Sequence, residues 1–148
     1  MKIIIGGAGA VGTHLAELLS NEKQDIILMD EDQSKLNKMD SNFDLMTVCA
    51  SPTSIQALKN TGVDDADLFI AVMPEESRNM TACMLATNLG AKKTVARIDN
   101  YEYLLPKNKS FFAKLCNVCS QICHLACALH IFARCNNYST HKKTSIYN

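Results

Sequence analysis

The chain opens with an apolar strand that runs directly into a Gly-x-Gly-x-x-Gly sequence. The strand is predicted at residues 2–6, and the glycines follow at Gly7, Gly9 and Gly12. A helical pattern comes next, and the second predicted strand, at residues 25–30, ends on Asp30. A glycine turn between a strand and a helix, with an acidic residue closing the next strand, is the fingerprint of a dinucleotide-binding β-α-β unit. It constrains the rest of the chain to continue an α/β fold.

The three glycines each have a physical role in such a unit. Gly7 permits the tight turn off the strand, Gly9 lets the backbone approach a pyrophosphate, and Gly12 lets the helix pack against the sheet. The first turn of the helix offers unpaired N–H groups and the positive end of the helix dipole to the phosphates. A glycine-rich turn without a ligand is the alternative, and the flanking strand, helix and acidic residue argue against it.

The acidic end of the second strand predicts which nucleotide the unit binds. Asp30 can accept hydrogen bonds from both ribose hydroxyls of an adenosine. Its neighbours Glu31 and Asp32 are acidic as well, and no arginine stands nearby in the sequence. A 2′-phosphate would be repelled there, so NAD(H) is favoured over NADP(H).

Strands and helices alternate through the first two thirds of the chain. Further strands are predicted at residues 45–49, 67–73 and 94–98, and helices at residues 11–21, 33–40, 51–62 and 75–89. Ser51 is expected to cap the third helix, with Pro52 at its first position. The pattern predicts a Rossmann-like, doubly wound parallel sheet of five or six strands with helices on both faces.

Ligands of such sheets lie beyond the carboxyl ends of the strands. The candidate contacts are therefore Gly7, Ala8, Gly9, Ala10, Val11 and Gly12, then Asp30, the pairs Ala50-Ser51 and Met73-Pro74, and Arg97. Arg97 is expected at the same edge, facing a phosphate or a carboxylate. A surface ion pair is the alternative for this arginine.

Composition divides the chain into two parts. The 148 residues suffice for one domain, and neither a run of 18 apolar residues nor a leader pattern is present, so no membrane span or signal peptide is expected. The seven cysteines are expected to be reduced thiols. All 15 acidic residues lie at or before Glu102. We therefore expect a nucleotide-binding domain at 1–115 and a basic, cysteine-rich tail at 116–148.

The tail leaves three alternatives open. Its cysteines and a histidine recur at helical spacing, at Cys116, Cys119, Cys123, Cys127 and His130. They could ligate zinc, although zinc ligands usually sit on turns; they could line a helix that covers the sheet; or the tail could come from a shifted reading frame or a truncated gene. No metal site is predicted, and residues 136–148 are expected to be disordered.

An ordered set of segments resembles the N-terminal nucleotide-binding domain of the TrkA family, also called the KTN or RCK domain. These segments are the glycine turn, Asp30 with Asp32 and Lys35-Leu36, residues 64–67 leading into 69–72, Asn79 with Ala82-Cys83, residues 96–98, and residues 101–103. The resemblance covers about residues 1–105. The sequence departs from it at Ala50, where the family usually has glycine, and at Met73-Pro74, where it usually has threonine and asparagine. Both changes are expected to weaken nucleotide affinity, because alanine restricts the backbone and proline lacks an N–H donor.

The resemblance implies a regulatory subunit of a potassium uptake system. Such domains lie on the cytoplasmic side of a membrane transporter subunit, form dimers and larger rings, and bind NAD(H), or ATP or ADP in some relatives. By the same resemblance the candidate contacts given above are the nucleotide contacts. Neither an enzymatic activity nor a nucleic-acid partner is expected.

Two other functions remain open. One is a small NAD-dependent oxidoreductase or a fragment of one, for which Tyr103 and Lys107 mimic the catalytic pair of short-chain dehydrogenases. Pro106 lies between them, and those enzymes space their glycines differently, so this spacing is interpreted as coincidence. The other is a purely structural role, with a nucleotide bound but no signal transmitted.

Overall fold

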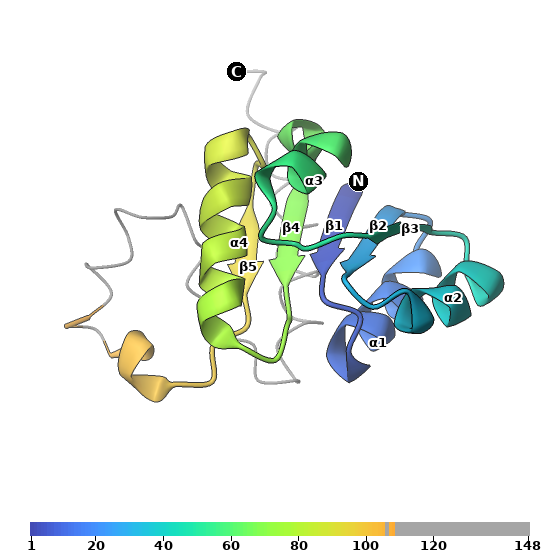
Figure 1. The fold of residues 1–148 in the computed structure, drawn as a ribbon. Coiled ribbons are helices and arrows are strands. Elements are labelled where there is room, and N and C mark those ends of the chain that lie inside the picture. The colour runs from blue at the N-terminus through green and yellow to red at the C-terminus, as the bar shows by residue number, and fades with distance from the viewer. Residues whose placement is uncertain (106, 109–148) are drawn as a thin grey trace, which may run out of the picture.

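Five parallel strands form a single sheet in the order β3-β2-β1-β4-β5 (Figure 1). The structure is a computed structural model of the chain, and it describes residues 1–105, 107 and 108. The strands are β1 (Lys2–Gly6), β2 (Asp25–Asp30), β3 (Met46–Cys49), β4 (Leu68–Ala71) and β5 (Thr94–Ala96). The helices are α1 (Ala10–Ser20), α2 (Gln33–Asn42), α3 (Ile55–Asn60) and α4 (Glu76–Leu89), with the 3-10 helices η1 (Val63–Asp65) and η2 (Tyr101–Leu104).

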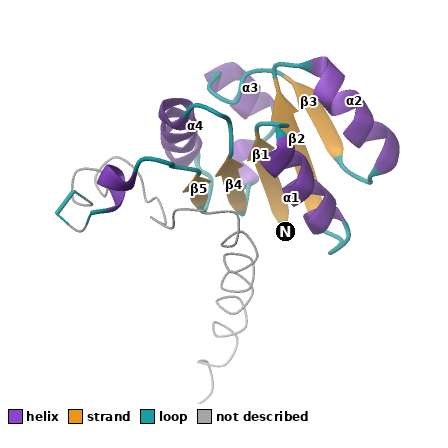
Figure 2. Cartoon of the chain, turned by 90° about the horizontal axis from the view of Figure 1, so that it is seen from below, coloured by secondary structure: helices purple, strands orange, loops and turns teal. Residues whose placement is uncertain are grey.

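Helices cover both faces of this sheet. Helices α1 and α2 pack on one face, and α3 and α4 pack on the other (Figure 2). Alternate residues of β1 serve the two layers: Ile3 and Ile5 join the cluster under α1 and α2, and Ile4 joins the opposite one. A strand buried on both faces needs an apolar side chain at every position, which explains the continuous apolar runs in the sequence.

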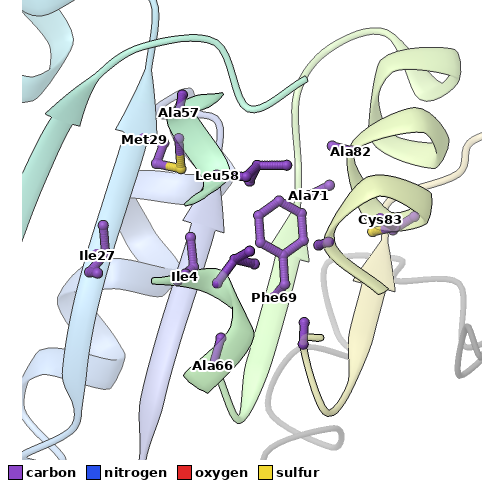
Figure 3. Packing of buried hydrophobic residues seen from close by; sticks show 14 of the residues in the cluster. Ile4, Ile27, Met29, Ala57, Leu58, Ala66, Phe69, Ala71, Ala82 and Cys83 are labelled. Carbon is purple, nitrogen blue, oxygen red and sulfur yellow. The ribbon is translucent and has the colours of Figure 1, made fainter. Parts of the chain in front are cut away.

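The layer under α3 and α4 is built around one aromatic side chain. Phe69 of β4 is fully buried and lies among Leu58 of α3 and Ala82 and Cys83 of α4 (Figure 3). The small residues on α4 let this helix lie close to the sheet while the phenyl ring fills the space between the two helices.

The strand order reverses at β1, and we refer to the carboxyl edge of the sheet beside β1, where open α/β sheets bind ligands, as the crevice. The chain passes from β1 to β2 and β3 on one side, then crosses back through α3 to β4 on the other side. The strands are parallel, and the arrows of β1 and β4 point toward the bottom of Figure 1, where the loops after these two strands lie next to each other. Ligands of open α/β sheets bind at such a reversal.

The predicted fold class is confirmed by this topology. The strands predicted at residues 2–6 and 25–30 have the observed bounds, whereas β4 is shorter than the predicted 67–73. Its neighbour β1 ends at Gly6, which pairs with Ala71, and the Val72 N–H makes the last hydrogen bond to β1, at the Gly6 carbonyl. The described residues contain five strands.

The predicted start of the third helix is wrong. Ser51 does not cap this helix, and Pro52 is not its first residue. The backbone N–H of Ser54 donates to the Ser51 carbonyl at 3.0 Å, so residues 51–54 form a turn. Ser54 is the cap, because its hydroxyl accepts from the Ala57 N–H at 3.3 Å and α3 begins at Ile55. Both serines stand before helix-forming residues, and the turn at Pro52 decides between them.

The predictions for the tail at 116–148, including the alternative of a zinc site, lie outside the described residues. Within the described part, no helix has both the length and the apolar character needed to cross a membrane. That part also contains no cluster of histidine, cysteine and acidic side chains suited to a metal ion.

One carboxylate joins three strands at the opposite, amino-terminal edge of the sheet. Asp67, just before β4, accepts a hydrogen bond from the Lys2 backbone N–H at 2.9 Å and pairs with Lys92 Nζ at 2.8 Å. Lys92 first, and then the Lys2 N–H, hold the pKa of Asp67 below its ordinary value.

Replacing this carboxylate tests its contribution to stability. We expect Asp67→Asn to lower the free energy of unfolding by about 1 kcal/mol at pH 7. The folded-state pKa is depressed, so the stabilisation is complete above the ordinary carboxyl pKa and is lost as the pH falls through the folded value, below about pH 4. Urea unfolding of both proteins at pH 7 and pH 3 measures the difference. A difference of the same size at the two pH values would contradict this origin.

Candidate functional site

The loop after β1 is held against two neighbouring strands. The Gly7 N–H donates to the Met29 carbonyl of β2 at 2.8 Å, and the Val72 N–H after β4 donates to the Gly6 carbonyl at 2.8 Å. Gly7 has φ +113°, a conformation that side chains rarely adopt. A Cβ there would also lie 3.0 Å from the Met73 nitrogen. The strand therefore turns away at Gly7 only because no side chain is present.

Helix α1 lies in direct contact with this loop at Gly12. A Cβ on Gly12 would stand 1.7 Å from the Gly7 carbonyl oxygen, so no other residue fits without moving the helix. The absence of a side chain at Gly12 thus fixes where the first turn of α1 begins.

The open side of the loop is at Gly9. Gly9 is the N-cap of α1 with φ −75°, and a Cβ built on it would meet nothing within 4 Å. The first N–H groups of a helix have no partner inside the helix and attract anions. In α1 these groups belong to Ala10, Val11 and Gly12. The space beside Gly9 is therefore open on the side where these donors lie.

Asp30 lies beside this loop, as the sequence predicts. One carboxylate oxygen accepts from the Ala8 N–H at 2.7 Å, and the other accepts from the Asp32 N–H at 2.9 Å. Lys35 Nζ stands 3.5 Å from the same carboxylate. The Asp30 side chain is 13% exposed, so β2 and the loop hold it in one position at the edge of the crevice.

The turn at Ala50-Ser51 lies next to Asp30 on the side of β3. The Ala50 N–H donates to the Asp30 carbonyl at 3.0 Å. The Ser51 hydroxyl accepts from Arg78 Nη2 at 3.2 Å, and the same nitrogen donates to Glu31 Oε1 at 2.7 Å. Ser51 first, and then Arg78, hold the pKa of Glu31 below its ordinary value. Sequence reasoning missed Arg78, because no local pattern places a residue of α4 beside the end of β2.

The turn at Met73-Pro74 is fixed by one buried amide. Asn79 is fully buried; its Oδ1 accepts from the Met73 N–H at 2.7 Å. Its Nδ2 donates to the Met73 carbonyl at 2.9 Å and to the Arg97 carbonyl at 3.0 Å. Asn79 was not among the candidate contacts. Its spacing from Ala82, Cys83 and Ala86 places it on the buried face of α4, and this was the signal that could have found it.

The described side-chain contacts of Arg97 do not include the glycine loop. Its guanidinium forms a double hydrogen bond with Asp99, at 3.1 Å and 2.9 Å. The carboxylate that Arg97 faces is thus a near neighbour in the sequence, which agrees with the alternative of a surface ion pair. The crevice edge therefore holds the glycine loop, Asp30, Ala50-Ser51 and Met73-Pro74, and Arg97 follows β5 at the same edge of the sheet with its side chain paired to Asp99.

Comparison with known proteins identifies relatives of this chain. The model of the TrkA-N domain matches residues 3–114. The chain is 46% identical over 112 residues to the Trk system potassium uptake protein TrkA of Haemophilus influenzae, covering 75% of this chain and 24% of that protein. The TrkA of Vibrio alginolyticus is 39% identical over 112 residues, with the same coverage. The chain therefore spans about a quarter of the length of these relatives.

Solved structures share the fold at low sequence identity. The GsuK channel bound to NAD has a TM-score of 0.62 at 16% identity, covering 79% of this chain and 20% of that chain. The NAD(P)-binding domain of an exopolyphosphatase-related protein from Archaeoglobus fulgidus has a TM-score of 0.66 at 17% identity, covering 92% and 97%. At these identities the likeness concerns the fold alone.

Two glycines give opposite predictions for stability. We expect Gly12→Ala to lower the free energy of unfolding by about 1–3 kcal/mol or more, because its Cβ would overlap the Gly7 carbonyl. Gly9→Ala is expected to change it by less than about 1 kcal/mol, because its Cβ meets open space and alanine is only a weaker N-cap. Urea unfolding of the three proteins provides the measurement. Equal losses for the two variants would contradict the loop geometry.

The buried amide gives a second prediction. Asn79→Ala leaves the Met73 and Arg97 backbone groups without their partner, so we expect a loss of about 2–3 kcal/mol in unfolding free energy. Asn88→Ala on the exposed side of the same helix is the matched control, with an expected change within about 0.5 kcal/mol. A loss for Asn79→Ala no larger than for the control would refute the role assigned to this amide.

Proposed function

The chain belongs to the TrkA-N domain family, and from this premise we propose that it binds NAD(H) at the glycine loop and Asp30 as a regulatory domain of a potassium uptake system. The observation that carries the proposal is the open space beside Gly9, next to the N–H groups of α1 and close to a fixed carboxylate. In a dinucleotide-binding β-α-β unit the pyrophosphate lies at the helix N-terminus, and the adenosine ribose lies at the acidic residue that ends the second strand.

Asp30 has the hydrogen-bonding capacity that the ribose requires. A carboxylate offers about four acceptor positions. Two are used by the Ala8 and Asp32 N–H groups, so capacity for both ribose hydroxyls is left while the side chain stays in place. In this proposal the loop and α1 bind the phosphates, and Asp30 orients the adenosine.

The choice of nucleotide follows from the same groups. Structures of GsuK carry NAD in one case and ADP in another, and both ligands contain a diphosphate and an adenosine. We propose NAD(H) as the ligand, with ATP or ADP as the alternative. Glu31 and Asp32 disfavour a 2′-phosphate, and two cations offset part of their charge: Lys35, which is paired with Asp30 and Asp32, and Arg78, which is paired with Glu31.

We further propose a route from the nucleotide to the rest of the protein. Asn79 ties the turn at Met73 to the Arg97 backbone, and Glu76 Oε2 accepts from the Asp99 N–H at 3.1 Å and the Asn100 N–H at 2.9 Å. The start of α4 is thus bonded both to the turn at the crevice and to the segment that leaves β5. A shift of the turn on binding would move that segment as well.

The partner in this proposal is a membrane potassium transporter subunit. The relatives at 46% and 39% identity are Trk system potassium uptake proteins, and the chain matches about a quarter of each. We propose that the domain acts on the cytoplasmic face of the membrane, assembled as a dimer or a larger ring, and that it catalyses no reaction itself.

Titration with nucleotides tests this function. We expect NADH to bind the full chain and to raise its thermal midpoint. At an NADH concentration 100 times the dissociation constant, binding should stabilise the folded state by about 2.7 kcal/mol. Asp30→Ala is expected to weaken binding at least about 10-fold, because the ribose loses charge-assisted hydrogen bonds. Gly9→Ala is expected to weaken it similarly by filling the space beside the loop.

The exposed Asp44→Ala is the control, with unchanged affinity expected. Failure of the unaltered chain to bind NADH, NAD, ADP or ATP would overturn the proposal. Hydride transfer to or from an added alcohol or hydroxy acid would instead support an oxidoreductase.

A further inference from the structure

Arg78 links three elements at the adenosine end of the crevice. It stands in the first turn of α4, and its Nη2 lies 2.7 Å from Glu31 Oε1 and 3.2 Å from Ser51 Oγ. Its Nη1 lies 3.9 Å from Glu75. The guanidinium therefore reaches from the helix after β4 to the residues that follow β2 and β3, and its side chain is only 35% exposed.

The position of Asp30 determines what would lie beside this guanidinium. Glu31 is the next residue after Asp30, and Ser51 follows Ala50, whose N–H donates to the Asp30 carbonyl. If Asp30 holds the adenosine ribose, the base extends from that ribose over the ends of β2 and β3. Arg78 contacts both of these ends through Glu31 and Ser51.

We propose that Arg78 is a specificity-determining residue of the nucleotide site, with its guanidinium as the platform on which the adenine base stacks. This inference rests on the proposed nucleotide binding and adds the subsite that recognises the base. A guanidinium is planar and stacks on aromatic rings as a cation. Guanidinium N–H groups donate in the plane of the group, so the hydrogen bonds to Glu31 and Ser51 orient it without using its faces.

The pairing with Glu31 keeps the platform in place. Glu31 is ionised at neutral pH, and the contact between Arg78 and Glu31 joins residues 47 positions apart. It can form only when β2 and α4 are packed together. An exposed ion pair contributes little to stability, so its replacement is expected to leave the fold intact while changing ligand affinity.

Three variants of the full chain test this platform. We expect Arg78→Ala to weaken NADH and ADP binding by about 5- to 30-fold through loss of the stacking contact. Arg78→Lys is expected to weaken both by several-fold, because lysine keeps the charge but lacks the plane. Lys59→Ala, an exposed lysine at the opposite edge of the sheet, is the control for loss of one positive charge. Thermal midpoints of the free proteins check that all of them fold.

Inorganic pyrophosphate, measured as a competitor of NADH, separates the base from the phosphates. We expect its inhibition constant to stay within about 2-fold in Arg78→Ala, because it has no base to stack. Equal weakening of ADP and pyrophosphate would overturn the platform and assign Arg78 to the phosphates. Full affinity in Arg78→Ala or in Arg78→Lys would overturn it as well. Absence of nucleotide binding by the unaltered chain would overturn the proposed function itself, and this inference with it.

Discussion

The close approach of α1 to the loop after β1 is the constraint on which the rest of the crevice depends. A Cβ built on Gly12 would lie only 1.7 Å from the Gly7 carbonyl oxygen, so the helix can begin where it does only because residue 12 has no side chain. The first turn of α1 therefore begins beside the end of β1. In the loop between them the Ala8 N–H donates to Asp30, so the carboxylate lies next to the helix terminus. The two features that favour a nucleotide are thus consequences of the same packing.

Much of the fold could be predicted because its signals are local. Continuous apolar runs predict strands buried on both faces, and the helix predicted at residues 75–89 ends at the observed residue, where Gly90 adopts a left-handed conformation. The start of α3 could not be predicted in this way. Ser51 and Ser54 are equally good caps in isolation, and the choice depends on Pro52. Pro52 lies close to Gly6: a Cβ built on Gly6 would stand 2.9 Å from the Pro52 Cβ. The two residues are 46 positions apart in the sequence.

In the candidate site, too, the residues with a local sequence signal were predicted and those that depend on long-range contacts were not. Asp30 and the glycine loop were predicted because they form a short motif, and the structure brings them within hydrogen-bonding distance. Asn79, Lys35 and Arg78 were missed as site residues, because the function of each depends on a partner in another element. The spacing of Asn79 within α4 marks a buried position, but the two segments that its amide bonds to lie outside the helix and could not be inferred from that spacing. Whether the predicted contacts bind a nucleotide stays a prediction until the ligand is titrated.

Arg97 and Arg78 both form ion pairs, but the two pairs differ in how far apart their residues are in the sequence, and this difference matters for inferring function. Arg97 pairs with Asp99, two residues away, and such a pair can form wherever the local backbone allows it. Its geometry carries little information about a ligand. Arg78 pairs with Glu31 across 47 residues, and only the folded sheet brings these two groups together. Long side chains lose rotamer freedom when they are held in this way, and an exposed ion pair returns little stability for that loss. The Arg78–Glu31 pair therefore fixes a guanidinium at the end of β2 beside Asp30, and this fixed position is what the proposed recognition of the base requires.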